Sequence, residues 1–177
     1  TQTAAWGDYD NDGWLDLFIG NESRAPDDPH PSELYHNNRD GTFADATASF
    51  ASADLGYVKG TTWGDIDNDG WQDLFVSVKQ GRNFLFRNGG RPGARDPRGR
   101  DWRFTDVTFA AGVVEPPNSF PTWFWDYDND GWLDLFVAGY MPTSIDDAAG
   151  LYLGRPTRTD MPRLYRNNRD RTFTDVT

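Results

Sequence analysis

The feature that most constrains this chain is an acidic loop that occurs three times, each time directly before an apolar run. The copies span residues 8–18, 65–75 and 126–136 and read DYDNDGWLDLF, DIDNDGWQDLF and DYDNDGWLDLF. Each copy places four Asp residues within nine positions. Carboxylates at that density repel one another unless a cation lies among them, and a hard divalent cation with oxygen ligands is the natural partner. The repeat therefore predicts three metal-binding loops.

The positions of these Asp residues favour calcium. Asp at loop positions 1, 3 and 5 brings three carboxylates round a tight turn, and Gly at position 6 permits the backbone geometry of that turn. We expect the backbone carbonyl of position 7 to point inward and the Asp of position 9 to close the shell with two oxygens. The predicted ligands of the three Ca²⁺ sites are Asp8, Asp10, Asp12, Trp14 and Asp16; Asp65, Asp67, Asp69, Trp71 and Asp73; and Asp126, Asp128, Asp130, Trp132 and Asp134.

Other readings of the loop are weaker. An EF-hand would require Glu at position 12, where this chain has Ile19, Val76 and Val137. Mg²⁺ would prefer fewer protein ligands, and zinc would require His or Cys. An Asp-rich turn that binds nothing remains the alternative, against which three coincident copies argue. We expect each ion to link two strands of its repeat, without a catalytic role.

The net charge of −11 is concentrated in the loops. They contain 12 of the 28 acidic residues, and the other 16 nearly balance the 17 Lys and Arg residues. The chain has no Cys, which excludes a disulfide framework and thiolate metal sites. No segment approaches the length of a membrane span. We expect neither membrane insertion nor a nucleic-acid partner.

The repeat unit consists of four short β-type runs. One run precedes the loop (4–6, 61–63 and 122–124), one follows it (17–19, 74–76 and 135–137), and two come later (34–37 and 43–47, 85–88 and 104–108, 164–167 and 173–177). No window of useful length keeps a helical period. Four short strands per repeat are typical of a propeller blade. The prediction is an all-β chain, a single β-propeller segment over 1–177, with three four-stranded antiparallel blades at about 1–57, 58–118 and 119–177.

Three blades are fewer than propellers use to close, which is four to eight. An isolated arc would expose strand edges and blade faces. The chain therefore predicts additional blades in a longer parent, self-association of two arcs into six blades, or an unusual closure. The sequence does not choose among these.

The order of strands also divides the loops between two faces. The acidic loops share one face with the Arg-rich insert at 89–103. The inserts 21–32 and 140–162 and the connectors 48–60 and 109–121 share the opposite face. Long loops on a rigid scaffold are where binding sites are commonly built. The opposite face is our candidate for contact with a protein or glycan partner.

These motifs resemble FG-GAP/VCBS repeats over nearly the whole chain. The resemblance is carried by WGDYDNDGWLDLF at 6–18, LYHNNRDGTF at 34–43 and FTDVT at 104–108 and 173–177. It implies an integrin-α-type β-propeller, closest to ASPIC/UnbV-type proteins and cartilage acidic protein. It further implies bound calcium, an extracellular, periplasmic or cell-surface location, and a role in adhesion or recognition.

Some residues depart from the repeat. Trp125 stands where the other copies have Gly7 and Gly64, so the third blade must pack differently there. Gln72 replaces Leu15 and Leu133, and we expect it to face solvent.

The aromatic and basic residues have ordinary explanations. The Trp residues that recur with the repeat are expected to pack between blades, while Trp102 lies outside the register and is the better surface candidate. The Arg-rich insert is expected to be a solvated loop, with an anion-binding role as the alternative. His36 aligns with Arg87 and Arg166 and is therefore a repeat position rather than an isolated catalytic base.

The leading hypothesis is a non-catalytic, calcium-stabilised propeller module for extracellular recognition. The alternative is the propeller part of a calcium-dependent polysaccharide lyase or another carbohydrate-active enzyme. Catalysis would then use acids and arginines of the last insert, namely Asp146, Asp147, Arg155, Arg158 and Asp160. A third possibility is a pure scaffold whose partner surface lies on other blades.

Overall fold

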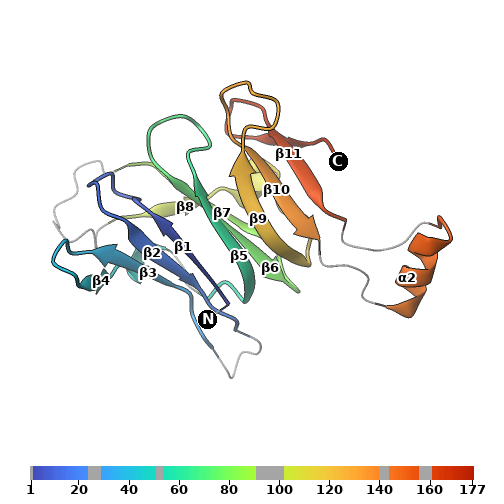
Figure 1. Ribbon diagram of the computed structural model, residues 1–177, viewed down its shortest axis with the longest axis horizontal. Helices are drawn as coiled ribbons and strands as arrows, with labels where there is room; N and C mark the ends of the chain where they lie inside the picture. Colours follow the sequence, from blue (N-terminus) through green and yellow to red (C-terminus); the bar gives the residue numbers. More distant parts are fainter. Residues whose placement is uncertain (1, 24–28, 51–53, 91–101, 140–143, 156–160) are drawn as a thin grey trace.

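Three four-stranded antiparallel sheets follow one another along the chain in the computed structural model (Figure 1). It describes residues 2–23, 29–50, 54–90, 102–139, 144–155 and 161–177. Sheet 1 contains β1 (Thr3–Gly7), β2 (Asp16–Gly20), β3 (Glu33–Asn37) and β4 (Phe43–Asp45). Sheet 2 contains β5 (Tyr57–Gly64), β6 (Asp73–Lys79), β7 (Phe84–Asn88) and β8 (Phe104–Asp106). Sheet 3 contains β9 (Ser119–Trp125), β10 (Asp134–Gly139), β11 (Arg163–Asn167) and β12 (Phe173–Asp175).

In each sheet the strands lie in chain order, as expected for propeller-like blades. The acidic loop joins the first two strands as a hairpin, so that the residue before the loop pairs with the last Asp: Gly7 with Asp16, Gly64 with Asp73 and Trp125 with Asp134. The prediction of an all-β fold built from three such blades is confirmed.

The apolar core lies between neighbouring sheets. One cluster joins sheets 1 and 2 and includes the buried side chains of Tyr9, Phe18 and Phe86. A second joins sheets 2 and 3 and includes those of Ile66 and Phe75. Burial of this kind contributes about 25 cal/mol per Å² of apolar surface, so the association of adjacent blades supplies much of the stability of each.

Glycine permits the close approach of one blade to the next. A Cβ atom on Gly7 would lie 2.7 Å from the Trp63 ring of sheet 2, and one on Gly64 would lie 2.7 Å from the Phe124 ring of sheet 3. Trp125 occupies the equivalent position in sheet 3, and its ring lies 6.0 Å from that of Trp123 and 6.2 Å from that of Phe136. The third blade therefore packs differently here, as its sequence predicts.

Two expectations about individual side chains were wrong. Trp102 is only 2% exposed, and its indole N–H donates to Asn88 Oδ1 at 2.8 Å, so it is a core residue and not a surface one. Gln72 is half-buried, and its Oε1 is shielded from solvent beside Gly7. Gln72 therefore faces sheet 1 rather than solvent, because position 8 of the loop contributes to the contact between blades.

Short helices also lie between the strands, although no helical period is evident in the sequence. They are η1 (Thr47–Ser49), α1 (Thr108–Ala111) and α2 (Ile145–Tyr152). The last lies apart from the three sheets (Figure 1). Ser144 caps α2 by accepting the Asp147 N–H, and Asp146 and Asp147 lie in its first turn, a local signal that overrides the absence of an apolar face.

Candidate metal-binding loops

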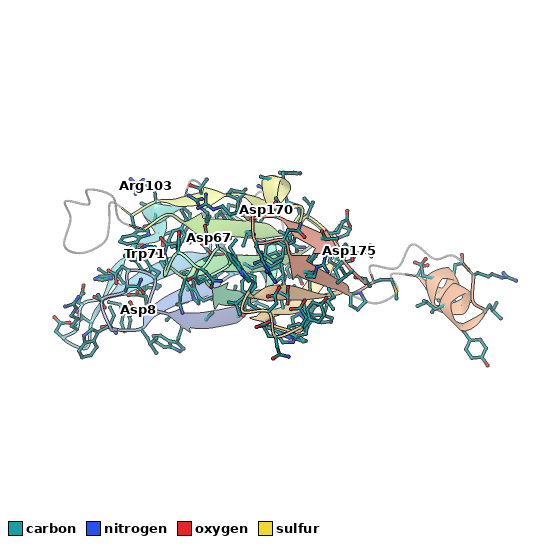
Figure 2. The ribbon with its side chains drawn as sticks, turned by 90° about the horizontal axis from the view of Figure 1, so that it is seen from above. Asp8, Asp67, Trp71, Arg103, Asp170 and Asp175 are labelled. Carbon is teal, nitrogen blue, oxygen red and sulfur yellow. The ribbon has the colours of Figure 1, made fainter. Side chains whose placement is uncertain are left out.

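The three acidic loops emerge at the same end of the sheets (Figure 1). Figure 2, which looks from above, shows Asp8 of the first loop beside sheet 1 and Asp67 of the second beside sheet 2. The Gly at position 6 has φ of +86 to +89° in all three loops, a conformation that disfavours residues with a Cβ atom. The Asn at position 4 also has positive φ, at 53–57°, which Asn tolerates better than most residues.

The first Asp of each loop organises the turn. Asp8 Oδ1 accepts the N–H of Asp12 at 3.0 Å, and its Oδ2 accepts that of Gly13 at 2.9 Å. Asp65 and Asp126 accept the corresponding N–H groups at 2.8–3.1 Å. The loop conformation is thus fixed by its own side chains before any ligand is considered.

The last Asp of each loop is buried and ties the loop to the third strand. Asp73 Oδ1 accepts the N–H of Asn88 at 2.7 Å, and its Oδ2 accepts the N–H of Ile66 at 2.9 Å. Asp16 and Asp134 make the same pair of bonds at 2.8–3.2 Å. Because each oxygen accepts one backbone N–H, one lone pair remains on each for a ligand.

The Asp at loop position 3 has one carboxylate oxygen without a partner in loops 1 and 2. Asp10 Oδ1 and Asp67 Oδ1 are both buried and have no hydrogen-bond partner. In loops 2 and 3 the ligand atoms of positions 1, 3 and 9 lie within 4.8 Å of one another. In loop 1 the same holds for Asp8, Asp10 and Asp12, and separately for Asp10, Asp16 and His36.

The structure therefore brings together most of the predicted carboxylate ligands. Asp69 and Asp130 stand outside these groups of converging atoms. The three Trp residues of position 7 donate their N–H to the Asp of position 5 at 2.9–3.0 Å. Backbone and carboxylate oxygens of this kind are the ligands that calcium prefers.

Burial disfavours the charged form of these carboxylates and so raises their pKa values. It raises the pKa of both Asp16 and Asp73 to about 7, against an ordinary value of 3.8. Burial likewise raises the pKa of Asp134 and of Asp10, and the neighbouring carboxylate of Asp12 adds to the effect at Asp10. In each case the cause is the cost of an unsolvated negative charge, which a bound cation would remove.

Arginine side chains compensate part of this charge, which sequence reasoning missed. Arg39 contacts Asp12 Oδ2 at 2.6 Å, and Arg169 contacts Asp130 Oδ2 at 2.6 Å. Arg171 of sheet 3 reaches across to Asp67 Oδ2 of loop 2 at 2.8 Å. The Asn-Arg-Asp triplets at 38–40 and 168–170 were the available signal for Arg39 and Arg169, since they recur at the corresponding turn of the first and third repeats.

Asparagine side chains link each loop to the next, and they too were missed. Asn11 donates to Gly70 O at 2.6 Å, and Asn68 donates to Gly131 O at 3.1 Å. In the opposite direction, Asn88 donates to Tyr9 O at 2.7 Å and Asn167 donates to Ile66 O at 2.8 Å. Asn at loop position 4 and at the end of the third strand in every copy was the sequence signal.

Comparison with protein families supports the repeat assignment. A family model described as an FG-GAP-like repeat matches residues 8–76, which include the first two loops. Residues 8–76 of the chain therefore contain an FG-GAP-like repeat. The third loop lies outside the matched residues and shares with loop 2 the convergence of the carboxylates at positions 1, 3 and 9. No curated protein matches the chain.

The opposite face of the FG-GAP blades carries a hollow of about 380 Å³ between sheets 1 and 2. It is lined by the connector residues 54–57, by residues 78–82 and by Ser23 and Phe84. Its lining combines the charged residues Asp54, Lys79 and Arg82 with apolar side chains such as Leu55 and Val78. This is the face on which the sequence places a partner.

Of the residues considered for catalysis, Asp146, Asp147 and Arg155 lie in the described part of the chain, in or next to α2. The hydroxyl of Ser144, the N-cap of α2, donates to the carboxylate of Asp147 at 2.7 Å. Arg158 and Asp160, like most of the Arg-rich insert, lie outside the described residues. No described helix is long and apolar enough to cross a membrane.

Proposed function

We propose that this chain is a calcium-binding FG-GAP propeller module that recognises an extracellular protein or glycan and has no catalytic role. The observation that carries the proposal is the convergence of carboxylate oxygens in all three loops, within 4.8 Å of one another. A hard dication is the partner that such oxygens select.

The residues fit calcium by their chemistry. The first Asp is held by loop N–H groups, the last by the backbone of the third strand, and the middle Asp of loops 1 and 2 keeps a buried oxygen without a partner. The arginines are the competing charges, and each contacts only one carboxylate of its loop. The other carboxylates remain available to a cation.

Bound calcium would hold together the loop that joins the first two strands of a blade. Through the last Asp of that loop it would also stabilise the contact with the end of the third strand. If each site has the affinity of extracellular modules, near 10⁻⁴ M, then about 10⁻³ M calcium would stabilise the fold by roughly 1.4 kcal/mol per site. Sites of that affinity fill only where free calcium is millimolar. We therefore place the protein outside the cell, in the periplasm or at the cell surface.

Recognition is assigned to the face opposite the loops. The hollow beside residues 54–57 and 78–82 offers charged and polar groups on rigid strands and short connectors. Together with the apolar side chains of the same hollow, these groups suit a protein segment or a glycan, which present both polar and apolar surface.

The test is a calcium titration by calorimetry, combined with thermal melting of the chelator-treated chain. We expect about three ions per chain and a melting temperature that rises with calcium. Asp67→Asn and Asp128→Asn should each remove one ion, whereas Asp146→Asn, an exposed residue of α2 with the same change of charge, should remove none. Unchanged melting and the absence of binding heat in millimolar calcium would overturn the proposal.

A further inference from the structure

We propose that loop 1 differs from the other two loops in metal preference, because His36 gives it a nitrogen ligand. With Asp10 and Asp16, His36 forms a site for a borderline transition dication of the Zn²⁺ and Co²⁺ class. This inference rests on the proposed function only in treating loop 1 as a dication site.

The donor atoms are already close together. His36 Nδ1 lies 3.3 Å from Asp16 Oδ1 and 3.6 Å from Asp10 Oδ2. Two ligands of a tetrahedral ion that each lie about 2.1 Å from the metal are separated by roughly 3.4 Å. The spacing is therefore that of neighbouring ligands around one small dication.

Burial and the absence of a partner set His36 apart from a surface histidine. Its side chain is 5% exposed, those of Asp10 and Asp16 are 6% and 0% exposed, and Nδ1 makes no hydrogen bond. Asp10 Oδ1 is likewise buried and unpartnered. An unsatisfied buried imidazole nitrogen directed at two carboxylates is costly unless something binds between them.

The surroundings hold the ligands in place. Asp16 is oriented by the N–H groups of Tyr9 and Asn37, at 3.2 and 2.8 Å. The Tyr9 ring packs edge-on against the imidazole, with 6.2 Å between ring centroids. Such second contacts around a metal ligand fix its orientation and strengthen binding.

The other two loops cannot offer the same ligand set. Their residues at this position are Arg87 and Arg166. Arg87 Nη1 lies 4.0 Å from Asp67 Oδ2, where it acts as a counter-charge, and a guanidinium has no lone pair to give to a metal. Imidazole with carboxylate suits zinc and its neighbours, whereas all-oxygen sites suit calcium.

The competing explanation is that His36 acts only as a counter-charge to the carboxylates, as Arg87 does. The two explanations differ in what His36→Arg does. If the residue supplies charge alone, Arg restores the repeat pattern without loss. If it supplies a ligand, Arg removes the site.

The experiment is a titration of the chelator-stripped full chain with Co²⁺, followed by visible absorption, and with Zn²⁺ against a chromophoric chelator, both in millimolar calcium. The wild type and His30→Arg, which changes the exposed second histidine, should bind one ion and give intense cobalt d–d bands. His36→Arg should weaken that binding at least tenfold and remove the bands. His36→Gln provides the same test if the Arg variant fails to fold, as judged by circular dichroism.

Equal cobalt binding by wild type and the His36 variants, or no uptake by the wild type, would overturn the inference. The outcome is separable from that of the calcium proposal, since Asp67→Asn and Asp128→Asn report on loops 2 and 3 alone. Failure of calcium binding with retained, His36-dependent cobalt binding would refute the proposed function and leave this inference standing.

Discussion

The hydrogen bond from the third strand of one blade to the loop of the preceding blade should be measurable with a matched pair of variants. The Asn167 amide donates to Leu133 O at 3.0 Å within its blade and to Ile66 O at 2.8 Å across to sheet 2, while its Oδ1 accepts the Arg169 N–H at 2.8 Å. Asn37 makes the two equivalent bonds within its own blade, at 3.0 and 2.9 Å. Among the side-chain hydrogen bonds of the described residues, the pair therefore differs by the one bond between blades.

The expected difference follows from that one bond and its burial. A net hydrogen bond contributes about 0.5–1.5 kcal/mol, and an acceptor left buried without a partner costs about 1–3 kcal/mol. Ile66 is fully buried, so its carbonyl loses a partner that water cannot readily replace. We expect Asn167→Ala to lower the free energy of unfolding by about 1–3 kcal/mol more than Asn37→Ala does.

The assay is urea unfolding monitored by tryptophan fluorescence, with and without calcium, because both Asn residues also position the last Asp of a loop through their N–H groups. The backbone N–H survives the substitution, so the difference between the two variants should persist in chelator. Equal destabilisation by both variants would refute the argument that bonds between loops hold the blades together.

Three further predictions concern the loops and the open edge of the blade array. Because burial raises the pKa of Asp16 and Asp73 to about 7, the folded metal-free chain binds protons more tightly than the unfolded chain; its melting temperature in chelator should therefore fall as pH rises from about 4 to 7, and a rise would contradict this. Arg171→Ala should tighten calcium binding at loop 2 by up to about fivefold, since it removes an ion pair between the exposed Arg171 and the buried side chain of Asp67 that is worth about 0.2–1 kcal/mol, and calorimetry with Asp67→Asn as the null would show it. Trp125→Gly should restore the glycine that accepts the following blade and increase head-to-tail association, so light scattering that shows no change in mass at high concentration would count against this role of Trp125.

The blades could be predicted from the sequence because their determinants are local and repeated. The Asp and Gly positions of each loop fix a hairpin, and the apolar run after it pairs with the run before it, so that Trp6 lies opposite Leu17 and Trp63 opposite Leu74. Three copies of the same pattern reinforced one another. The convergence of the loop carboxylates followed from the same spacing.

Contacts between blades were not predictable in the same way, because they join residues far apart in the chain. The sequence favours a surface position for Trp102 because this residue stands outside the repeat, yet its ring packs beside Tyr9 and Trp71 and its N–H donates to Asn88. Arg171 lies 104 residues from Asp67, and nothing in its own repeat indicates that contact. Long-range partners of this kind depend on how neighbouring sheets are oriented, which a repeat pattern does not specify.

The three repeats share the residues that fix the acidic loop and its hairpin. They differ at the position where one blade contacts the next, which is Gly7, Gly64 and Trp125, and at His36 beside loop 1. A glycine that leaves room for an aromatic ring of the next blade is present as Gly7 and Gly64. A Cβ atom on either residue would lie 2.7 Å from that ring. Trp125 fills the equivalent place in sheet 3 and packs against Trp123, Phe136 and Tyr127, so a further blade could not approach in the same manner. At the other edge of the array, Trp6 and Leu15 of sheet 1 are 56% and 55% exposed. The residues at the same repeat positions in sheets 2 and 3 pack beside Gly7 and Gly64. The free edge of sheet 1 therefore cannot pack on sheet 3 in the way that neighbouring sheets pack on each other, because Trp125 replaces the glycine. This argues against closure of two copies into a ring unless Trp125 is displaced.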